Sequence, residues 1–66
     1  MNVPQWSYDR WTSTHERSIY GCRLFVRFDG TTFGWTVLYA GEIARSGRAP
    51  SLATAMSAAI DWTRTQ

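Results

Sequence analysis

The side chains of this sequence best suited to chemistry are arginine and aromatic, and the chemistry they favour is binding. All 7 basic residues are arginines, and the aromatic residues are 4 Trp, 3 Tyr and 3 Phe. The planar guanidinium offers paired donors that match carboxylates and phosphates, and aromatic rings supply large contact areas. A GC-rich genome is the alternative explanation for the absence of lysine. The net charge of +2 permits an acidic protein or a nucleic acid as partner and requires neither.

Residues that carry out catalysis or bind metals are scarce. The single histidine, His15, and the single cysteine, Cys22, cannot supply the ligands of a zinc site. We expect His15 to be solvated in a loop and Cys22 to be a small buried hydrophobe. The carboxylates are Asp9, Glu16, Asp29, Glu42 and Asp61. Their spacing suggests no shared cleft for acid–base work, and Asp61 is placed to pair with Arg64.

No glycine-rich segment of the sequence matches a phosphate-binding loop. We therefore predict that the protein is not an enzyme, that it has no catalytic residues and that it uses no cofactor and no metal.

The length of 66 residues corresponds to a single small domain, 1–66. A hydrophobic content of 44% with 18% charged residues argues against disorder. No apolar run is long enough to span a membrane, and the first ten residues have no apolar signal segment. We expect a cytoplasmic protein with no membrane contact. Its core is small enough to benefit from a partner or from self-association.

Alternating apolar residues on either side of Asp29-Gly30 predict a β-hairpin over 20–39. Asp29-Gly30 is a favoured type I′ turn pair. A two-residue turn places Val26 opposite Phe33. A four-residue loop would change the pairing but leave each side chain on the same face of the sheet. Cross-strand partners share a face, so most of the large apolar residues gather on one side of the sheet.

A third strand is expected over 42–46, after a turn at Ala40-Gly41 or at Gly41-Glu42. Its register stays open, so either Ile43 or Ala44 faces the core.

The segment before the hairpin divides into two parts. Residues 1–11 form either a short edge strand or an aromatic N-terminal arm, and residues 12–18 are polar throughout and predict a loop. The expected β-meander follows this N-terminal segment (1–18) and covers 19–47.

Apolar residues at helical spacing predict a C-terminal helix over 51–65. Ser51 follows Pro50 and is a favourable N-cap. Alanines on the apolar stripe, such as Ala55 and Ala59, let the helix approach a sheet of bulky side chains. The fold class is therefore α+β: an antiparallel three-stranded meander, with room for an extra N-terminal strand, and one helix packed on one face.

The sheet face turned away from the helix carries unexpected apolar residues. Strand alternation places Arg23, Phe25, Arg27 and Leu38 there, although a solvated face is normally polar. Either the N-terminal arm covers this face, with Trp6 or Trp11 stacked on Phe25 or on an arginine, or the face is an interface. The candidate partner-binding residues are Arg23, Phe25, Arg27, Leu38, Arg45, Arg48, Trp6 and Trp11.

A motif at the end of the sheet resembles a known family. The motif residues are Gly47, Ser51, Leu52, Ala55, Met56 and Ala59. With them, the segment 23–62 resembles the small strand–strand–strand–helix modules of HicB-type antitoxins. The Pro-rich loop usual in that family is missing, and no DNA-binding element follows. The resemblance implies a compact regulatory module that docks on a protein.

The leading functional hypothesis is a non-enzymatic protein-interaction module, a small bacterial or phage regulator or inhibitor that docks its outer sheet face on a partner. That partner is another protein or a second copy in a homodimer. The alternative is a nucleic-acid-binding module that uses the arginines and Phe25. A third option is an anion or small-molecule site at the helix start, near Arg45 and Arg48. Salt dependence separates the first two, because phosphate-dominated binding weakens steeply with salt.

Overall fold

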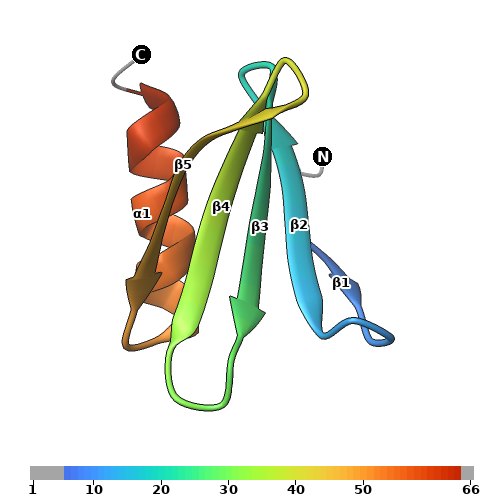
Figure 1. Cartoon of the computed structure of the whole chain (residues 1–66), viewed down its shortest axis with the longest axis vertical. Coiled ribbons are helices and arrows are strands. Elements are labelled where there is room, and N and C mark those ends of the chain that lie inside the picture. Colours follow the sequence, from blue (N-terminus) through green and yellow to red (C-terminus); the bar gives the residue numbers. More distant parts are fainter. Residues whose placement is uncertain (1–5, 65–66) are drawn as a thin grey trace, which may run out of the picture.

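A five-stranded antiparallel sheet with one helix on one face makes up the described part of the protein (Figure 1). The structure is a computed structural model that describes residues 6–64. The strands pair in chain order. Their bounds are β1 Ser7–Asp9, β2 Thr14–Ile19, β3 Cys22–Phe28, β4 Phe33–Tyr39 and β5 Glu42–Ala49, followed by α1 Leu52–Arg64. The predicted α+β class is confirmed, with two strands more than the three-stranded meander.

Two hairpins close with two-residue turns of the same kind. Tyr20-Gly21 joins β2 to β3, and Ala40-Gly41 joins β4 to β5. All four residues have positive φ, at 52° and 76° in the first turn and 55° and 83° in the second. Positive φ at both positions defines the type I′ turn, whose twist suits adjacent antiparallel strands. Of the two turns considered after β4, Ala40-Gly41 is the one that forms.

The prediction of a polar loop over 12–18 is wrong. Most of this segment is β2, which pairs along its length with β3. Apart from Ile19 its side chains are polar, but the backbone ladder with β3 and its half-buried position hold it in the sheet. Before it, β1 is the short edge strand that the sequence left open. The expectations for residues 1–5 and 65–66 lie outside the described residues.

The β3–β4 hairpin has the predicted faces but a different register. Phe28 pairs with Phe33 and Val26 with Trp35, so a four-residue loop replaces the two-residue turn. The carboxylate of Asp29 explains the longer loop. Its Oδ1 accepts hydrogen bonds from the backbone N–H groups of Thr31 at 2.9 Å and Thr32 at 2.8 Å. The backbone N–H of Asp29 in turn donates to the carbonyl of Thr32 at 3.0 Å.

The core lies between the sheet and α1. Leu24, Val26 and Val37 are fully buried, and the alanines of α1 that face them are buried as well. The helix packs mainly on β3, β4 and β5. It begins after the predicted N-cap, where Ser51 Oγ accepts a hydrogen bond from the backbone N–H of Thr54 at 3.2 Å. No helix within residues 6–64 is long and apolar enough to cross a membrane.

Trp35 joins the two halves of this core and lies directly over β5. Its indole packs against both clusters of buried side chains. It also lies opposite Gly47, where an added Cβ would stand 2.8 Å from Cζ2 of the ring. Position 47 therefore requires glycine because the Trp35 ring approaches it closely, and not because of its backbone conformation.

Candidate functional site

The sheet face opposite α1, called the outer face below, is organised in rows across the strands. One row is Arg23, Leu38 and Ile43; the next is Glu16, Phe25, Thr36 and Ser46; a third is Arg27, Gly34 and Arg48. Residues in a row point to the same side because paired residues share a face. Four strands, β2 to β5, thus contribute to one surface.

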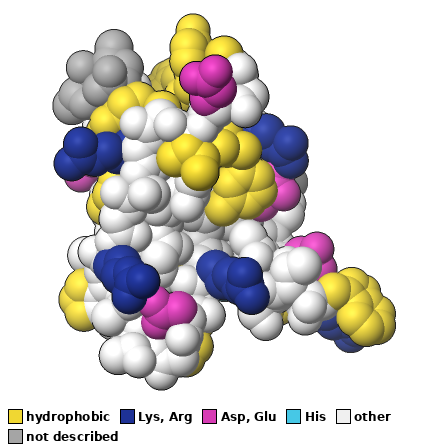
Figure 2. Space-filling view, viewed as in Figure 1, with side chains coloured by type: hydrophobic (Ala, Val, Ile, Leu, Met, Phe, Trp, Pro, Cys, Tyr) yellow, Lys and Arg dark blue, Asp and Glu magenta, His cyan; other side chains and the backbone are white. Residues whose placement is uncertain are grey.

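Three apolar side chains form a strip on the outer face. Phe25 and Leu38 are half-buried, and Ile43 is 67% exposed. Figure 2, in which α1 lies behind the sheet, shows hydrophobic side chains gathered in the middle of this face with arginines around them. A solvated sheet face is normally polar, so this apolar strip is the feature of the face that needs an explanation.

Arg23 is held against this strip. Its guanidinium forms an ion pair with Glu16, in which Nε lies 3.1 Å from Oε2, and it lies over the ring of Phe25 at 5.4 Å from the centroid. The pair is exposed to solvent, so it contributes at most about 1 kcal/mol to stability. Its effect is to neutralise the charge of Arg23 and to fix the position of its side chain.

Arg27 and Arg48 flank a gap on the same face. Both pair with Gly34, one from β3 and one from β5, and no side-chain atom lies within 4 Å of where a Cβ of Gly34 would stand. Their backbones are two strand spacings apart, about 10 Å. Two long guanidinium side chains on either side of such a gap can both reach one anionic group placed over Gly34.

The two arginines differ in their own partners. Arg48 Nη1 lies 3.3 Å from Oδ2 of Asp29. The pKa of Asp29 is lowered, chiefly by the backbone N–H groups of Thr32 and Thr31, with a smaller effect of Arg48. Arg27 makes no ion pair with any residue between 6 and 64. Arg27 is therefore the arginine of this gap that is available for an external carboxylate or phosphate.

A shallow hollow borders the apolar strip on the β1 side. It measures about 390 Å³. Its lining residues are Ser7, Tyr8, Asp9, Thr12, Thr14, Glu16, Phe25 and Arg27. Phe25 of the apolar strip and Arg27 of the gap also line this hollow. The hollow therefore extends the outer face toward β1.

Arg45 does not join the outer face. A bulge between β4 and β5 leaves Ala44 without a partner, so Ile43 pairs with Leu38 while Arg45 pairs with Val37, a core residue. This settles the open register: Ile43 points outward, and Arg45 lies on the helix side of an exposed edge strand.

The two tryptophans predicted to contact a partner lie elsewhere. Trp6 is half-buried and packs against both core clusters on the helix side. Trp11 is 85% exposed in the β1–β2 turn, with the guanidinium of Arg10 at 5.8 Å from its ring. Within residues 6–64 neither ring is stacked on Phe25 or on an arginine of the outer face. The rest of the N-terminal arm, residues 1–5, lies outside the described residues.

His15 and Cys22 both lie on strands of the sheet. Cys22 is a free, buried thiol in the core, as expected for a small hydrophobe. His15 was expected to be solvated in a loop, but it lies half-buried on β2, with its ring 4.7 Å from that of Tyr8. Among residues 6–64, no three His, Cys, Asp or Glu side chains form a group that could hold a metal ion.

Two residues of the candidate site on the outer face were not predicted from the sequence. Glu16 was assigned to a loop, and the Tyr20-Gly21 turn is the signal that would have placed it beside Phe25. Gly34 is not among the partner-binding residues predicted from the sequence. Its position between Arg27 and Arg48 follows from the register of β5. This register cannot be predicted from the sequence because β5 contains a bulge.

Comparisons with protein-family models, curated proteins and solved structures return no match to this chain. The resemblance to HicB-type modules therefore rests on the sequence motif alone.

Proposed function

We propose that the protein is a non-enzymatic interaction module that docks its outer face on an acidic surface of a partner protein. The observation that carries this proposal is the apolar strip of Phe25, Leu38 and Ile43 beside the Arg27–Gly34–Arg48 gap. Apolar anchors next to arginines have the composition of the centre of a protein interface.

Burial of the strip supplies part of the binding free energy. Full burial of such a side chain is worth about 1.5–3 kcal/mol, so a half-buried Phe25 or Leu38 has roughly 1 kcal/mol left to gain. Within residues 6–64 the helix covers the opposite face, and no other element covers the outer face. In this proposal the partner molecule supplies that cover.

The arginines specify the chemistry of that molecule. A carboxylate seated over Gly34 would lie between Arg27 and Arg48, with charge-assisted hydrogen bonds from either guanidinium. A second copy of the chain would oppose the same arginine-bearing face, so an acidic partner is favoured over a homodimer. A nucleic acid is less favoured, because Phe25 is the single aromatic side chain of the strip and Arg23 already covers it, whereas single-strand readers stack bases on several rings.

In biological terms the proposal is a small bacterial or phage regulator or inhibitor. This part is supported by the resemblance to HicB-type modules, which implies docking on a protein. The protein binds its target without chemical change, so its effect depends on occupancy of the outer face.

The test is affinity capture from a bacterial lysate with quantitative mass spectrometry, followed by reconstitution with the purified partner. The double variant Phe25→Asp/Arg27→Ala removes the anchor and the free charge. The matched control Trp11→Asp/Arg10→Ala makes the same charge change at the β1–β2 turn. We expect one acidic protein to be retained by the parent and the control, to be lost by the outer-face variant, and to bind with moderate salt dependence.

Three results would overturn this proposal. A parent that sediments as a dimer, and a Phe25→Asp/Arg27→Ala variant that is monomeric, would assign the face to self-association. Binding of a mixed-sequence single-stranded oligonucleotide at ~50 mM salt, with a steep salt slope, would assign it to nucleic acid. Equal retention of every protein by the parent, the variant and the control would remove the outer face from the function.

A further inference from the structure

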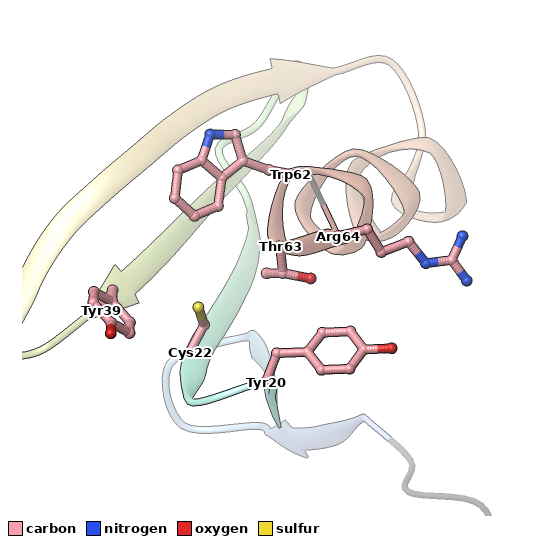
Figure 3. Close-up of a pocket in the computed structure, with 6 residues that line it drawn as sticks. All are labelled: Tyr20, Cys22, Tyr39, Trp62, Thr63 and Arg64. Atoms are coloured by element: carbon pink, nitrogen blue, oxygen red, sulfur yellow. The ribbon is translucent and has the colours of Figure 1, made fainter. Parts of the chain in front are cut away.

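A second hollow opens at the opposite surface, between the sheet and the C-terminal end of α1 (Figure 3). Its volume is about 580 Å³. Its lining residues are Tyr20, Cys22, Tyr39, Trp62, Thr63 and Arg64. These residues come from the two type I′ hairpin ends and the last turn of the helix, and none of them belongs to the outer face.

The floor of the hollow is fixed and its walls are aromatic. Cys22 and Thr63 are buried, and the Thr63 hydroxyl donates to the carbonyl of Ile60 at 2.6 Å. Figure 3 shows Tyr39 and Trp62 on one side of these two residues and Tyr20 on the other, so rings border the space from two directions. The volume lies in the range of small-molecule sites, about 300–1,000 Å³.

Tyr20 occupies a backbone position that disfavours it. Its φ of 52° is left-handed, and type I′ turns prefer Asn, Asp or Gly at this place. The ring is nevertheless 67% exposed, so core packing does not explain the choice of tyrosine. Strained backbone of this kind is found more often at functional sites, so an exposed ring held beside a hollow in a left-handed conformation is a candidate ligand contact.

Arg64 gives the hollow its charge. Its guanidinium forms no ion pair within residues 6–64, and the pairing with Asp61 expected from their spacing is absent. In Figure 3 the side chain extends on the same side as Tyr20. Aromatic rings alone suit organic cations, but an adjacent free guanidinium repels a cation and attracts an anion.

From this combination we infer that the hollow binds a small planar aromatic carboxylate. The rings of Tyr20, Tyr39 and Trp62 contact the faces and edges of the ligand ring, and Arg64 binds its carboxylate. An anion or small-molecule site at the start of the helix was the third option from the sequence. The geometry points to the end of the helix, where aromatic rings and the unpaired arginine line the same hollow. This site does not depend on the docking function of the outer face.

The probe for this site is 2-naphthoate, with neutral 2-naphthamide as its matched analogue, titrated into the ¹⁵N-labelled protein. We expect the indole N–H signal of Trp62 to shift while that of Trp11 does not. We also expect the amide to bind at least about ten-fold more weakly, since a hydrogen bond to a charged group is lost. Arg64→Gln should abolish this preference for the carboxylate, and Arg45→Gln, a change of another exposed arginine, should preserve it.

Tyr20→Asn separates binding from folding. Asn-Gly is the favoured type I′ pair, so this variant should melt at the same temperature as the parent or higher, yet bind naphthoate several-fold more weakly. Equal affinity for naphthoate and naphthamide, equal shifts of Trp11 and Trp62, or unchanged affinity in a folded Tyr20→Asn variant would each overturn the inference.

Discussion

A methyl group at Gly47 has no room while Trp35 keeps its position. The added Cβ would stand 2.8 Å from Cζ2 and 2.9 Å from both Cε2 and Nε1 of the indole, closer than side-chain carbons approach one another. The ring cannot move freely, because it also packs on both core clusters. Gly47→Ala should therefore displace Trp35 or bend β5.

The size of the effect follows from two opposing contributions. Overpacking of a core typically costs about 1–3 kcal/mol. Replacing glycine by alanine within a strand otherwise stabilises by about 0.5–1 kcal/mol, and Gly47 does not have the positive φ that would oppose it. The net loss in the free energy of unfolding should be between about 0 and 2.5 kcal/mol. A small domain of this kind has only ~3–10 kcal/mol in total.

Urea unfolding followed by circular dichroism measures this loss, and two variants isolate its cause. Gly34→Ala is the matched control in the neighbouring strand, since its Cβ would meet only backbone oxygens at 3.9 Å; it should stabilise the protein by about 0.5–1 kcal/mol. In a Trp35→Leu background, Gly47→Ala should become stabilising. The coupling free energy between positions 35 and 47 should therefore be about 1–3 kcal/mol. A Gly47→Ala protein as stable as Gly34→Ala, or zero coupling to Trp35, would refute the reasoning.

Three further changes test other contacts. Ser51→Ala removes the helix N-cap and should cost about 0.5–2 kcal/mol in urea unfolding, whereas Ser51→Asn should preserve the parent value; equal losses would contradict the cap. Because the folded-state pKa of Asp29 lies below its ordinary 3.8, its contribution to stability is present above that pH and lost as the pH falls through the lowered value. Asp29→Asn should therefore flatten this part of the acid unfolding profile, and an unchanged profile would contradict the assignment. Ala40→Asn relieves an alanine at φ 55° and should raise the free energy of unfolding by up to about 1 kcal/mol, or the melting temperature by roughly 4–8 °C; a lower melting temperature would argue against the type I′ geometry.

The parts of the fold that were predictable are those with a local signal. The alternation around Leu24 and Trp35 assigned both strands of the central hairpin to the correct faces, because face assignment depends only on parity. Helical spacing after Ser51 likewise located α1, which begins one residue after the predicted start and is described as far as Arg64. Parity also brought Phe25 and Leu38 together on the outer face, while their role in binding stays a prediction.

The parts that were missed depend on contacts between segments. β2 has almost no apolar residues of its own and is held by its ladder to β3, so its sequence resembles a loop. The register of the central hairpin follows from hydrogen bonds of the Asp29 carboxylate, which parity cannot detect. The bulge at Ala44 places Ile43 and Arg45 on opposite faces of the sheet, although strict alternation would place them on the same face, and no residue type in this segment predicts it.

The order of the elements along the chain has a consequence for synthesis. Each strand pairs with the one translated just before it, so short hairpins can form successively as the chain leaves the ribosome. The helix that shields Leu24 and Val37 is translated after all five strands. At typical elongation rates the 13 residues of Leu52–Arg64 take about 1–3 s to add. A chain released before Leu52 would lack this cover, and the exposed hydrophobic side of its sheet would be prone to aggregate.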